Sequence, residues 1–166
     1  CADFPEIKAS VMGDFVPAKL GMDDGELPVF MAVTEKFTET LVIFFKNGKG
    51  AKIPLSSYST KTKRKKLQNA YSELSEMVGM FVIEGEEDFI LKSTAGKVIM
   101  FNTALVLAKS TRDTQGVQVM RLTKAELASV QIAQNVDVED IERFRIKTVP
   151  AAGIISGDDI DQIKLI

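Results

Sequence analysis

A short basic segment near the middle of the chain holds the residues best suited to binding chemistry. Lys61-Thr62-Lys63-Arg64-Lys65-Lys66 packs five cations into six residues. An extended segment of this length spans about 20 Å, so it can follow several phosphates, each neutralised by one cation. If all five cations engage, the logarithm of affinity should fall with the logarithm of salt concentration with a slope of roughly −4 to −5. The pattern therefore indicates polyanion binding or, on the plainer interpretation, a solvated charged loop.

Composition alone does not favour a nucleic-acid binder. The 166 residues are 45% hydrophobic and 27% charged, which is ordinary for a folded soluble protein. The net charge is −2 and the isoelectric point is about 5.3, so the distribution of charge must decide. Acidic residues gather at 84–88 and again between Asp137 and Asp161, away from the basic segment. The near-zero net charge therefore hides a polarised chain.

The residue types argue against catalysis or metal binding within this chain. There is no His, and Cys1 is the single Cys. The commonest general base, a classical zinc site and an internal disulfide framework are therefore excluded, and the Cys usage is compatible with a cytoplasmic location. Carboxylate pairs such as Glu86-Glu87 and Asp158-Asp159 could hold a cation through oxygen, but solvated acidic turns explain them better. We expect no catalytic residue, no metal and no cofactor here, and no apolar run is long enough to span a membrane.

The positions of cations recur along the chain. Phe44 to Lys49 can be laid over Lys92 to Lys97 at a spacing of 48 residues, and the same spacing carries Arg64 onto Arg112. A fixed period of this size indicates a stacked or radial repeat. The repeat would place cations at a common rim of the fold, with the first unit more densely charged than the second. The candidate binding residues are Lys61, Lys63, Arg64, Lys65, Lys66, Lys109, Arg112, Arg121, Lys49 and Lys97.

The elements that must position these cations read as short strands. Asn47-Gly48 is a strong hairpin signal because both residues tolerate positive φ. Pro54 lacks an N–H, so the end of its strand should lie at a sheet edge. The second unit repeats the order, with a turn at 94–96. The expected strands are 30–34, 40–45 and 49–55 in the first unit, 80–83, 88–91 and 97–101 in the second, then 116–122.

Three or four short strands in about 48 residues are typical of an all-β, propeller-like fold built of blades. Thr123-Lys-Ala-Glu126 also matches a capping box ahead of Leu127, which would predict a helix there. The alternative is a third blade that opens at 128–133. The chain from Val149 onward should be irregular before a last strand at 163–166. The expected divisions are a partial blade at 1–27, blades at 28–78 and 79–127, and a partial blade with an acidic tail at 128–166.

Several of these motifs resemble one known family. Thr111 to Met120 is similar to a Thr-Arg-x-Thr-Gln-Gly-Val stretch in the C-terminal domain of the A subunit of bacterial type IIA topoisomerases, which include DNA gyrase and topoisomerase IV. Phe44 to Lys49, Ala51 to Tyr58 and Thr60 to Lys66 resemble a blade of the same domain. The resemblance is strong from Leu27 to Leu122. The gyrase heptad Gln-Arg-Arg-Gly-Gly-Lys-Gly is absent, which favours a topoisomerase IV-like or otherwise shortened subunit.

The resemblance implies a single β-pinwheel domain over 1–166, and the length of the chain leaves room for about three blades or partial blades. It implies binding and bending of double-stranded DNA without sequence preference, to guide a segment to the cleavage core. The implied partners are the catalytic core of the A subunit and the ATPase B subunit. The parent would use ATP and magnesium, neither held in this domain, in the bacterial cytoplasm near the nucleoid. Tyr58 and Tyr71 would serve packing and loop anchoring, because the catalytic tyrosine of the family lies upstream.

A rival interpretation is a propeller that binds other proteins and not DNA, since fold alone does not settle function. The acidic balance would suit that role. A further hypothesis concerns the acidic tail, which could fold over the basic rim and weaken DNA binding.

Overall fold

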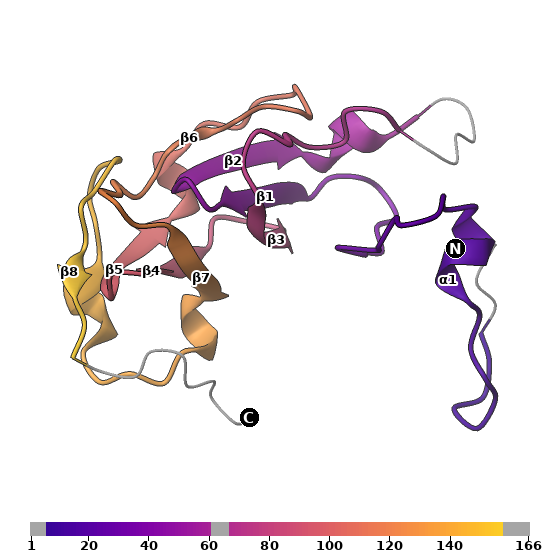
Figure 1. Cartoon of the computed structure of the whole chain (residues 1–166), viewed down its shortest axis with the longest axis horizontal. Coiled ribbons are helices and arrows are strands. Elements are labelled where there is room, and N and C mark those ends of the chain that lie inside the picture. The colour runs from indigo at the N-terminus through magenta and orange to yellow at the C-terminus, as the bar shows by residue number, and fades with distance from the viewer. Residues whose placement is uncertain (1–5, 61–66, 158–166) are drawn as a thin grey trace.

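Two four-stranded antiparallel sheets form the fold of the computed structural model, which describes residues 6–60 and 67–157 (Figure 1). The first sheet has the order β3-β1-β2-β6 and the second the order β7-β4-β5-β8. The all-β expectation is confirmed. The strands are β1 (Thr40–Phe45), β2 (Lys49–Pro54), β3 (Met77–Ile83), β4 (Asp88–Ser93), β5 (Lys97–Asn102), β6 (Val117–Gln118), β7 (Leu127–Ile132) and β8 (Ile154–Ile155). The short helices are α1 (Val16–Leu20), η1 (Leu55–Tyr58), η2 (Thr103–Leu105), η3 (Ala133–Asn135) and η4 (Ile141–Phe144).

The centre of each sheet is a hairpin, and both hairpins lie where the repeat predicts them. β1 and β2 meet at Asn47-Gly48, where Gly48 has a φ of 78° and the Asn47 side chain accepts a hydrogen bond from the Lys49 N–H at 3.1 Å. β4 and β5 meet at a turn in which Gly96 has a φ of 71°. Positive φ suits glycine and asparagine, so local turn chemistry fixes both hairpins. Pro54 lies at a sheet edge as expected, because β6 pairs with β2 only at Lys49 and Gly50.

A closing strand then pairs with the first strand of each hairpin. β3 lies beside β1 with Ile43 opposite Met80, and β7 lies beside β4 with Leu91 opposite Val130. The sequence pattern predicts that 80–83 begins the second unit, but β3 completes the first sheet, and the expected division between residues 78 and 79 falls inside this strand. A sequence period identifies the repeat without telling which neighbours pair.

The fourth strand of each sheet is a short return segment that we call a latch. Each latch begins with a glycine at a φ of 72°, Gly116 or Gly153, followed by the two-residue strand β6 or β8. These two residues pair with the start of the return strand of the preceding hairpin, at Lys49 and Gly50 or at Lys97 and Val98. A side chain at position 116 would overlap the Gly50 carbonyl. The latches tie consecutive units together.

The principal core lies between the two sheets. Phe44, Phe89 and Phe101 are at most 1% exposed, and the rings of Phe44 and Phe89 meet edge to face at 5.2 Å. A second cluster covers the outer face of the second sheet, where η3, η4 and the residues between them bury Val136 and Phe144 against Val98 and Met100. The outer face of the first sheet is covered more lightly, by half-buried aromatic side chains. These are Phe37, Tyr58 and Tyr71.

Four expected elements differ from the structure. Residues 30–34 form no strand, because no described residue pairs with them. The described part of 1–27 contains α1 and no strand. The helix predicted after the capping box is wrong, since Leu127 begins β7, where pairing with β4 outweighs the local capping signal. The strand expected at 116–122 is shorter, and the one expected at 163–166 lies outside the described residues.

Candidate nucleic-acid interface

The densest part of the predicted interface, Lys61 to Lys66, lies outside the described residues, but both of its flanks are held in place. The Arg112 guanidinium donates to the Ser57 carbonyl at 3.5 Å and to the Gln68 carbonyl at 3.3 Å. The Tyr58 hydroxyl donates to the Ala70 carbonyl at 2.7 Å. Burial raises the pKa of Tyr58, so it remains a neutral donor. The two flanks of the basic segment are therefore joined at its base, with Tyr58 in the anchoring role expected for it.

Arg112 also lines a polar cavity of about 450 Å³ beside these flanks. The remaining lining residues are hydroxyl, amide and acidic side chains. They are Ser57, Asn69, Ser110, Thr111 and Asp113. A guanidinium has five N–H donors, and its two carbonyl contacts leave donors for a further acceptor. Arg112 thus combines a fixed position with capacity for an anion.

Two more predicted cations lie along β2 with Arg112. The Lys49 ammonium donates to the Gln115 side chain at 3.0 Å. Exposed Lys109 is held by its backbone N–H, which donates to the Lys52 carbonyl at 2.8 Å. The chain between β5 and β6 runs out along the first sheet and returns beside β2 (Figure 1), so it carries Lys109 and Arg112 to the same edge as Lys49. This edge forms the described part of the candidate interface.

The last two predicted cations occupy different places. Arg121 is exposed and follows the first latch, with its backbone N–H donating to the Ala151 carbonyl at 2.7 Å. Half-buried Lys97 begins β5 in the second sheet and pairs with Ile155 of β8. The repeat predicts equivalent positions for Lys49 and Lys97, and both do begin a return strand beside a latch.

One buried cation was missed by sequence reasoning. The Lys52 side chain is only 11% exposed, and its ammonium lies 2.6 Å from Glu86 Oε1. The Thr103 hydroxyl donates to the other Glu86 oxygen at 2.6 Å. The Lys52 hydrogen bonds, then the Thr103 one, lower the pKa of Glu86. Lys52 therefore links the two sheets and is not a free surface charge. The only sequence signal for this role is the alternation of side-chain direction along β2, which separates Lys52 from its neighbours.

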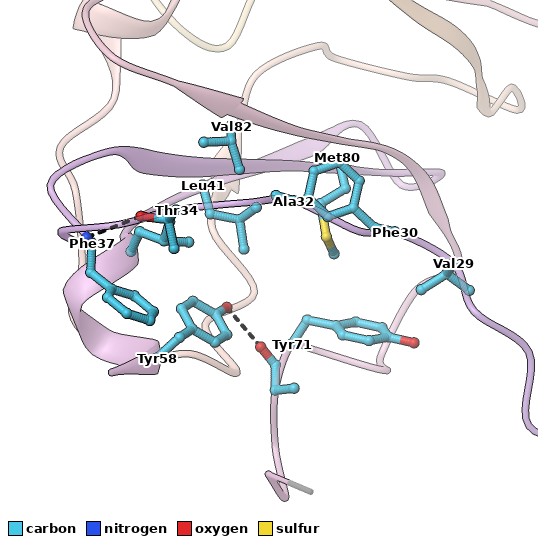
Figure 2. A pocket seen from close by; sticks show the side chains of 12 residues that line it. Val29, Phe30, Ala32, Thr34, Phe37, Leu41, Tyr58, Tyr71, Met80 and Val82 are labelled. Atoms are coloured by element: carbon cyan, nitrogen blue, oxygen red, sulfur yellow. Dashed lines mark hydrogen bonds between the residues drawn. The ribbon is translucent and has the colours of Figure 1, made fainter. Parts of the chain in front are cut away.

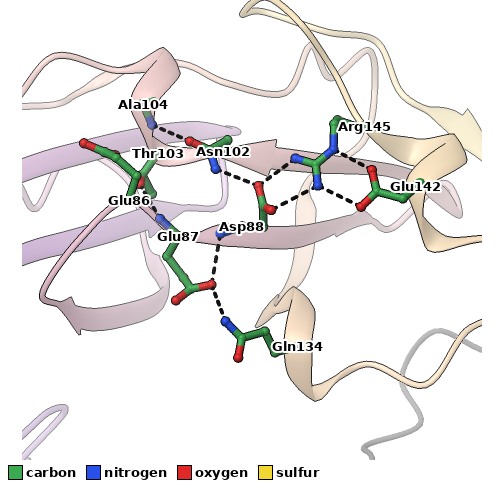
Figure 3. A network of polar contacts seen from close by, with 9 residues as sticks. All are labelled: Glu86, Glu87, Asp88, Asn102, Thr103, Ala104, Gln134, Glu142 and Arg145. Atoms are coloured by element: carbon green, nitrogen blue, oxygen red, sulfur yellow. Dashed lines mark hydrogen bonds and ion pairs between the residues drawn. The ribbon is translucent and has the colours of Figure 1, made fainter.

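A second polar network joins the start of β4 and the end of β5 in the second sheet to η4 (Figure 3). The Arg145 guanidinium makes two bonds to Asp88, at 2.8 and 3.0 Å, and two to Glu142, at 2.6 and 2.8 Å. Asn102 adds a donor to Asp88 at 2.8 Å. The Arg145 hydrogen bonds are the main reason that the pKa values of Asp88 and Glu142 are lowered. Asp88 and Glu86, expected in a solvated acidic loop, are thus engaged in structural contacts.

Other classes of site find no support in the part of the chain that is described. No group of three His, Cys, Asp or Glu side chains there is arranged to hold a metal ion. No helix within residues 6–60 and 67–157 is long and apolar enough to cross a membrane.

The arrangement of two latched sheets matches solved structures of one class, the β-pinwheel domains at the C-termini of type II topoisomerase A subunits. The C-terminal domain of a DNA topoisomerase IV matches 81% of this chain with a TM-score of 0.66 at 18% identity. The ParC C-terminal domain of E. coli matches 90% with a TM-score of 0.64 at 16% identity. A DNA gyrase A C-terminal domain matches 74% with a TM-score of 0.54 at 17% identity. The chain therefore has the β-pinwheel fold.

This chain is shorter than those domains. It covers 43% of the topoisomerase IV domain, 45% of the gyrase domain and 68% of the E. coli ParC domain. No family model and no curated protein matches the sequence. At identities below one fifth, the likeness concerns the fold.

Proposed function

We propose that this chain is a DNA-binding and DNA-bending accessory domain of an ATP-dependent type II topoisomerase. The observation that carries the proposal is the β-pinwheel fold shared with C-terminal domains of topoisomerase IV and gyrase A. The basic segment from Lys61 to Lys66 supplies the cations for phosphate binding, and Arg112 holds its two flanks at Ser57 and Gln68. Fold and charge thus support the same role from independent observations.

In this proposal, duplex DNA lies against the edge of β2. Lys61 to Lys66 provide most of the cations, and Lys49, Lys109 and Arg112 extend the contact along β2 and the chain that connects β5 to β6. Such contacts reach phosphates and not base edges, so binding has little sequence preference. Bending a site of 20–30 base pairs costs about 1–6 kcal/mol, and a patch of this size offsets only modest bending. We therefore propose weak binding with a shallow bend.

The role within a larger assembly is part of the same proposal. The domain would steer the bound segment to the cleavage core of the A subunit, and an ATPase B subunit would drive strand passage with ATP and magnesium. The site of action would be chromosomal DNA in the cytoplasm. Lys97 and Arg121 would add weaker contacts farther along the rim.

The direct test measures the salt dependence of binding to a random-sequence duplex by fluorescence anisotropy. Changing Lys63, Arg64, Lys65 and Lys66 together to Ala should lower the steepness of the log–log salt plot by about 3 to 4. A matched control removes the same charge from lysines placed elsewhere along the chain. Its substitutions are Lys8→Ala, Lys36→Ala, Lys124→Ala and Lys147→Ala.

The control variant should keep the steep salt dependence of the unmodified chain. No binding of the unmodified chain at low salt would refute the proposal and favour the protein-binding alternative. An equal loss in both quadruple variants would show that net charge, and not the basic segment, controls binding. Circular dichroism of each variant confirms that the fold is retained.

A further inference from the structure

An exposed apolar segment precedes the first sheet. Val29, Phe30, Met31, Ala32 and Val33 are five consecutive apolar residues, and all five are exposed, with Met31 at 75% and Val33 at 74%. Within the described ranges, no strand pairs with them. Such a run, rich in residues that favour strands, marks an interaction site when it lies bare.

The repeat assigns this segment a place in a sheet. Adding the 48-residue period carries 29–33 onto 77–81, which lies in the closing strand β3. Ala32 then corresponds to Met80, which lies opposite Ile43 in the first sheet. The segment 29–33 therefore corresponds in the repeat to a closing strand, although no described hairpin pairs with it.

A second segment repeats the pattern of a latch. Asn69 has a φ of 52°, and Ala70 and Tyr71 follow it as Val117 and Gln118 follow Gly116. Asn is among the few residues other than Gly that adopt this conformation readily. The segment also follows η1 as the first latch follows η2. Yet no described residue pairs with Ala70 or Tyr71 as a strand.

The two unpaired segments border one apolar cavity of about 300 Å³ (Figure 2). Val29, Phe30 and Ala32 line it from one segment, and Ala70 and Tyr71 from the other. The outer face of the first sheet supplies further lining side chains, those of Leu41, Met80 and Val82. An incomplete sheet would have this arrangement, with its two outer strands present and a gap between them.

We infer that residues 29–33 and 69–71 are the outer strands of a third sheet, and that the cleft between them accepts a β-hairpin of the same repeat. The order would be closing strand, hairpin and latch, as in both complete sheets. Their pairing also sets the register. Ala32 lies opposite the hairpin residue equivalent to Ile43, and Tyr71 and Ala70 lie opposite the first two residues of the return strand. Apolar side chains of the hairpin cover Leu41 and Met80.

The occupant is a further repeat of the same domain and not a second copy of this chain. Both hairpins described here already carry a closing strand and a latch, so a second copy has no free hairpin to donate. The solved domains with this fold are also longer, since the chain covers 43% and 45% of two of them. A third hairpin therefore has a ready source within a domain of this kind.

The test grafts a copy of residues 39–54 directly ahead of Ile7, in place of residues 1–6. Residues 7–28 then link the copy to Val29 over the same length as residues 55–76 link β2 to β3. Hydrogen exchange followed by NMR should show the amides of Met31, Val33 and Ala70 slowed by at least about 100-fold, because the alternation of the antiparallel ladder directs these N–H groups at the hairpin. A graft with the same residues in scrambled order is the matched control and should leave these amides unprotected.

A second variant tests whether the two segments belong to one sheet. Val33→Pro in the grafted chain removes an N–H that the closing strand would donate to the hairpin, and protection at Ala70 should fall at least about tenfold as the hairpin loosens. Unchanged exchange at Met31, Val33 and Ala70 in the grafted chain, with β1 and β2 still protected, would overturn the inference. Concentration-dependent dimerisation of the unmodified chain that protects 29–33 would also overturn it, in favour of a second copy.

Discussion

The two sheets share one plan but finish their outer faces differently. In the second sheet, η4 and the chain around it bury Phe144 to 2% exposure, and Arg145 fastens this cover to Asp88. In the first sheet, half-buried Tyr58 and Tyr71 leave an open apolar cavity instead. Two sheets built around equivalent hairpins can therefore have differently covered outer faces. The outer face of the second sheet is covered by η4 and the residues around it, whereas the outer face of the first sheet keeps an apolar cavity beside the candidate DNA-binding edge.

Phe144→Ala should produce the largest loss of stability, because it opens the sealed face. Phe144 packs in one buried cluster with Ile90, Val98 and Met100. Removing a buried Phe side chain typically costs about 3–5 kcal/mol. Urea unfolding followed by circular dichroism measures the change in the free energy of unfolding.

The counterpart on the open face is Tyr71→Ala, which should cost only about 1–2 kcal/mol, as expected for a half-buried side chain. If Tyr71→Ala costs as much as Phe144→Ala, the first sheet's outer face is sealed in solution and the contrast between the sheets is lost. A similar m-value for both variants would show that each still unfolds in one transition.

Gly48→Ala compared with Gly96→Ala should give the next largest difference. Both glycines have positive φ, which costs an alanine about 1 kcal/mol. A Cβ at position 48 would also meet the Met120 carbonyl, the Gln118 amide and Leu122, whereas nothing lies within 4 Å of a Cβ at position 96. We expect about 2–4 kcal/mol for Gly48→Ala, since overpacking adds about 1–3 kcal/mol.

Gly96→Ala should cost about 1 kcal/mol, set by the backbone conformation alone. Equal losses in the two variants, measured by urea unfolding, would mean that the segment from Gln118 to Leu122 does not press on the first turn. The pair of variants therefore tests whether the first hairpin is clamped by the chain that returns from the second.

Local signals allowed much of this fold to be predicted. The hairpins at Asn47-Gly48 and Gly96 follow from turn chemistry, which depends on neighbouring residues only. The pairing of β3 with β1 could not be derived, since an apolar strand is compatible with either neighbour. Residues 30–34 have the composition of a strand but lack a described partner, so propensity alone predicted a strand that the structure does not contain there. Leu127 shows the reverse, because a capping signal yielded to sheet pairing.

In the candidate site, too, the local features could be predicted from the sequence and the long-range contacts could not. The density of charge from Lys61 to Lys66 is visible in composition, and the repeat relates Arg64 to Arg112. That Arg112 reaches the Ser57 and Gln68 carbonyls could not be foreseen, because the contacts cross 55 and 44 residues of sequence. Arg145 bonds Asp88 from 57 residues away, so no local pattern distinguishes this ion pair from a solvated acidic turn.

Acid should weaken the second sheet more than the first, with the smallest effect of the series. The Arg145 hydrogen bonds lower the pKa of Asp88 and of Glu142 in the folded state. Unfolded Asp and Glu titrate near 3.9 and 4.3. The stability from a lowered pKa is therefore complete above about pH 5 and is lost as the pH falls through the folded-state values. For Asp88, at 26% exposure of its side chain, the loss should be about 1 kcal/mol.

Arg145→Met separates this network from general acid unfolding. The variant should be less stable than the unmodified chain at pH 7, and its stability should fall less steeply between pH 5 and pH 3, because Asp88 and Glu142 no longer gain from ionisation in the fold. Lys46→Met, which breaks the exposed pair with Glu76 in the first sheet, should leave the acid dependence unchanged. Urea unfolding at a series of pH values measures both. Parallel pH curves for Arg145→Met and the unmodified chain would show that the network does not fasten the cover of the second sheet.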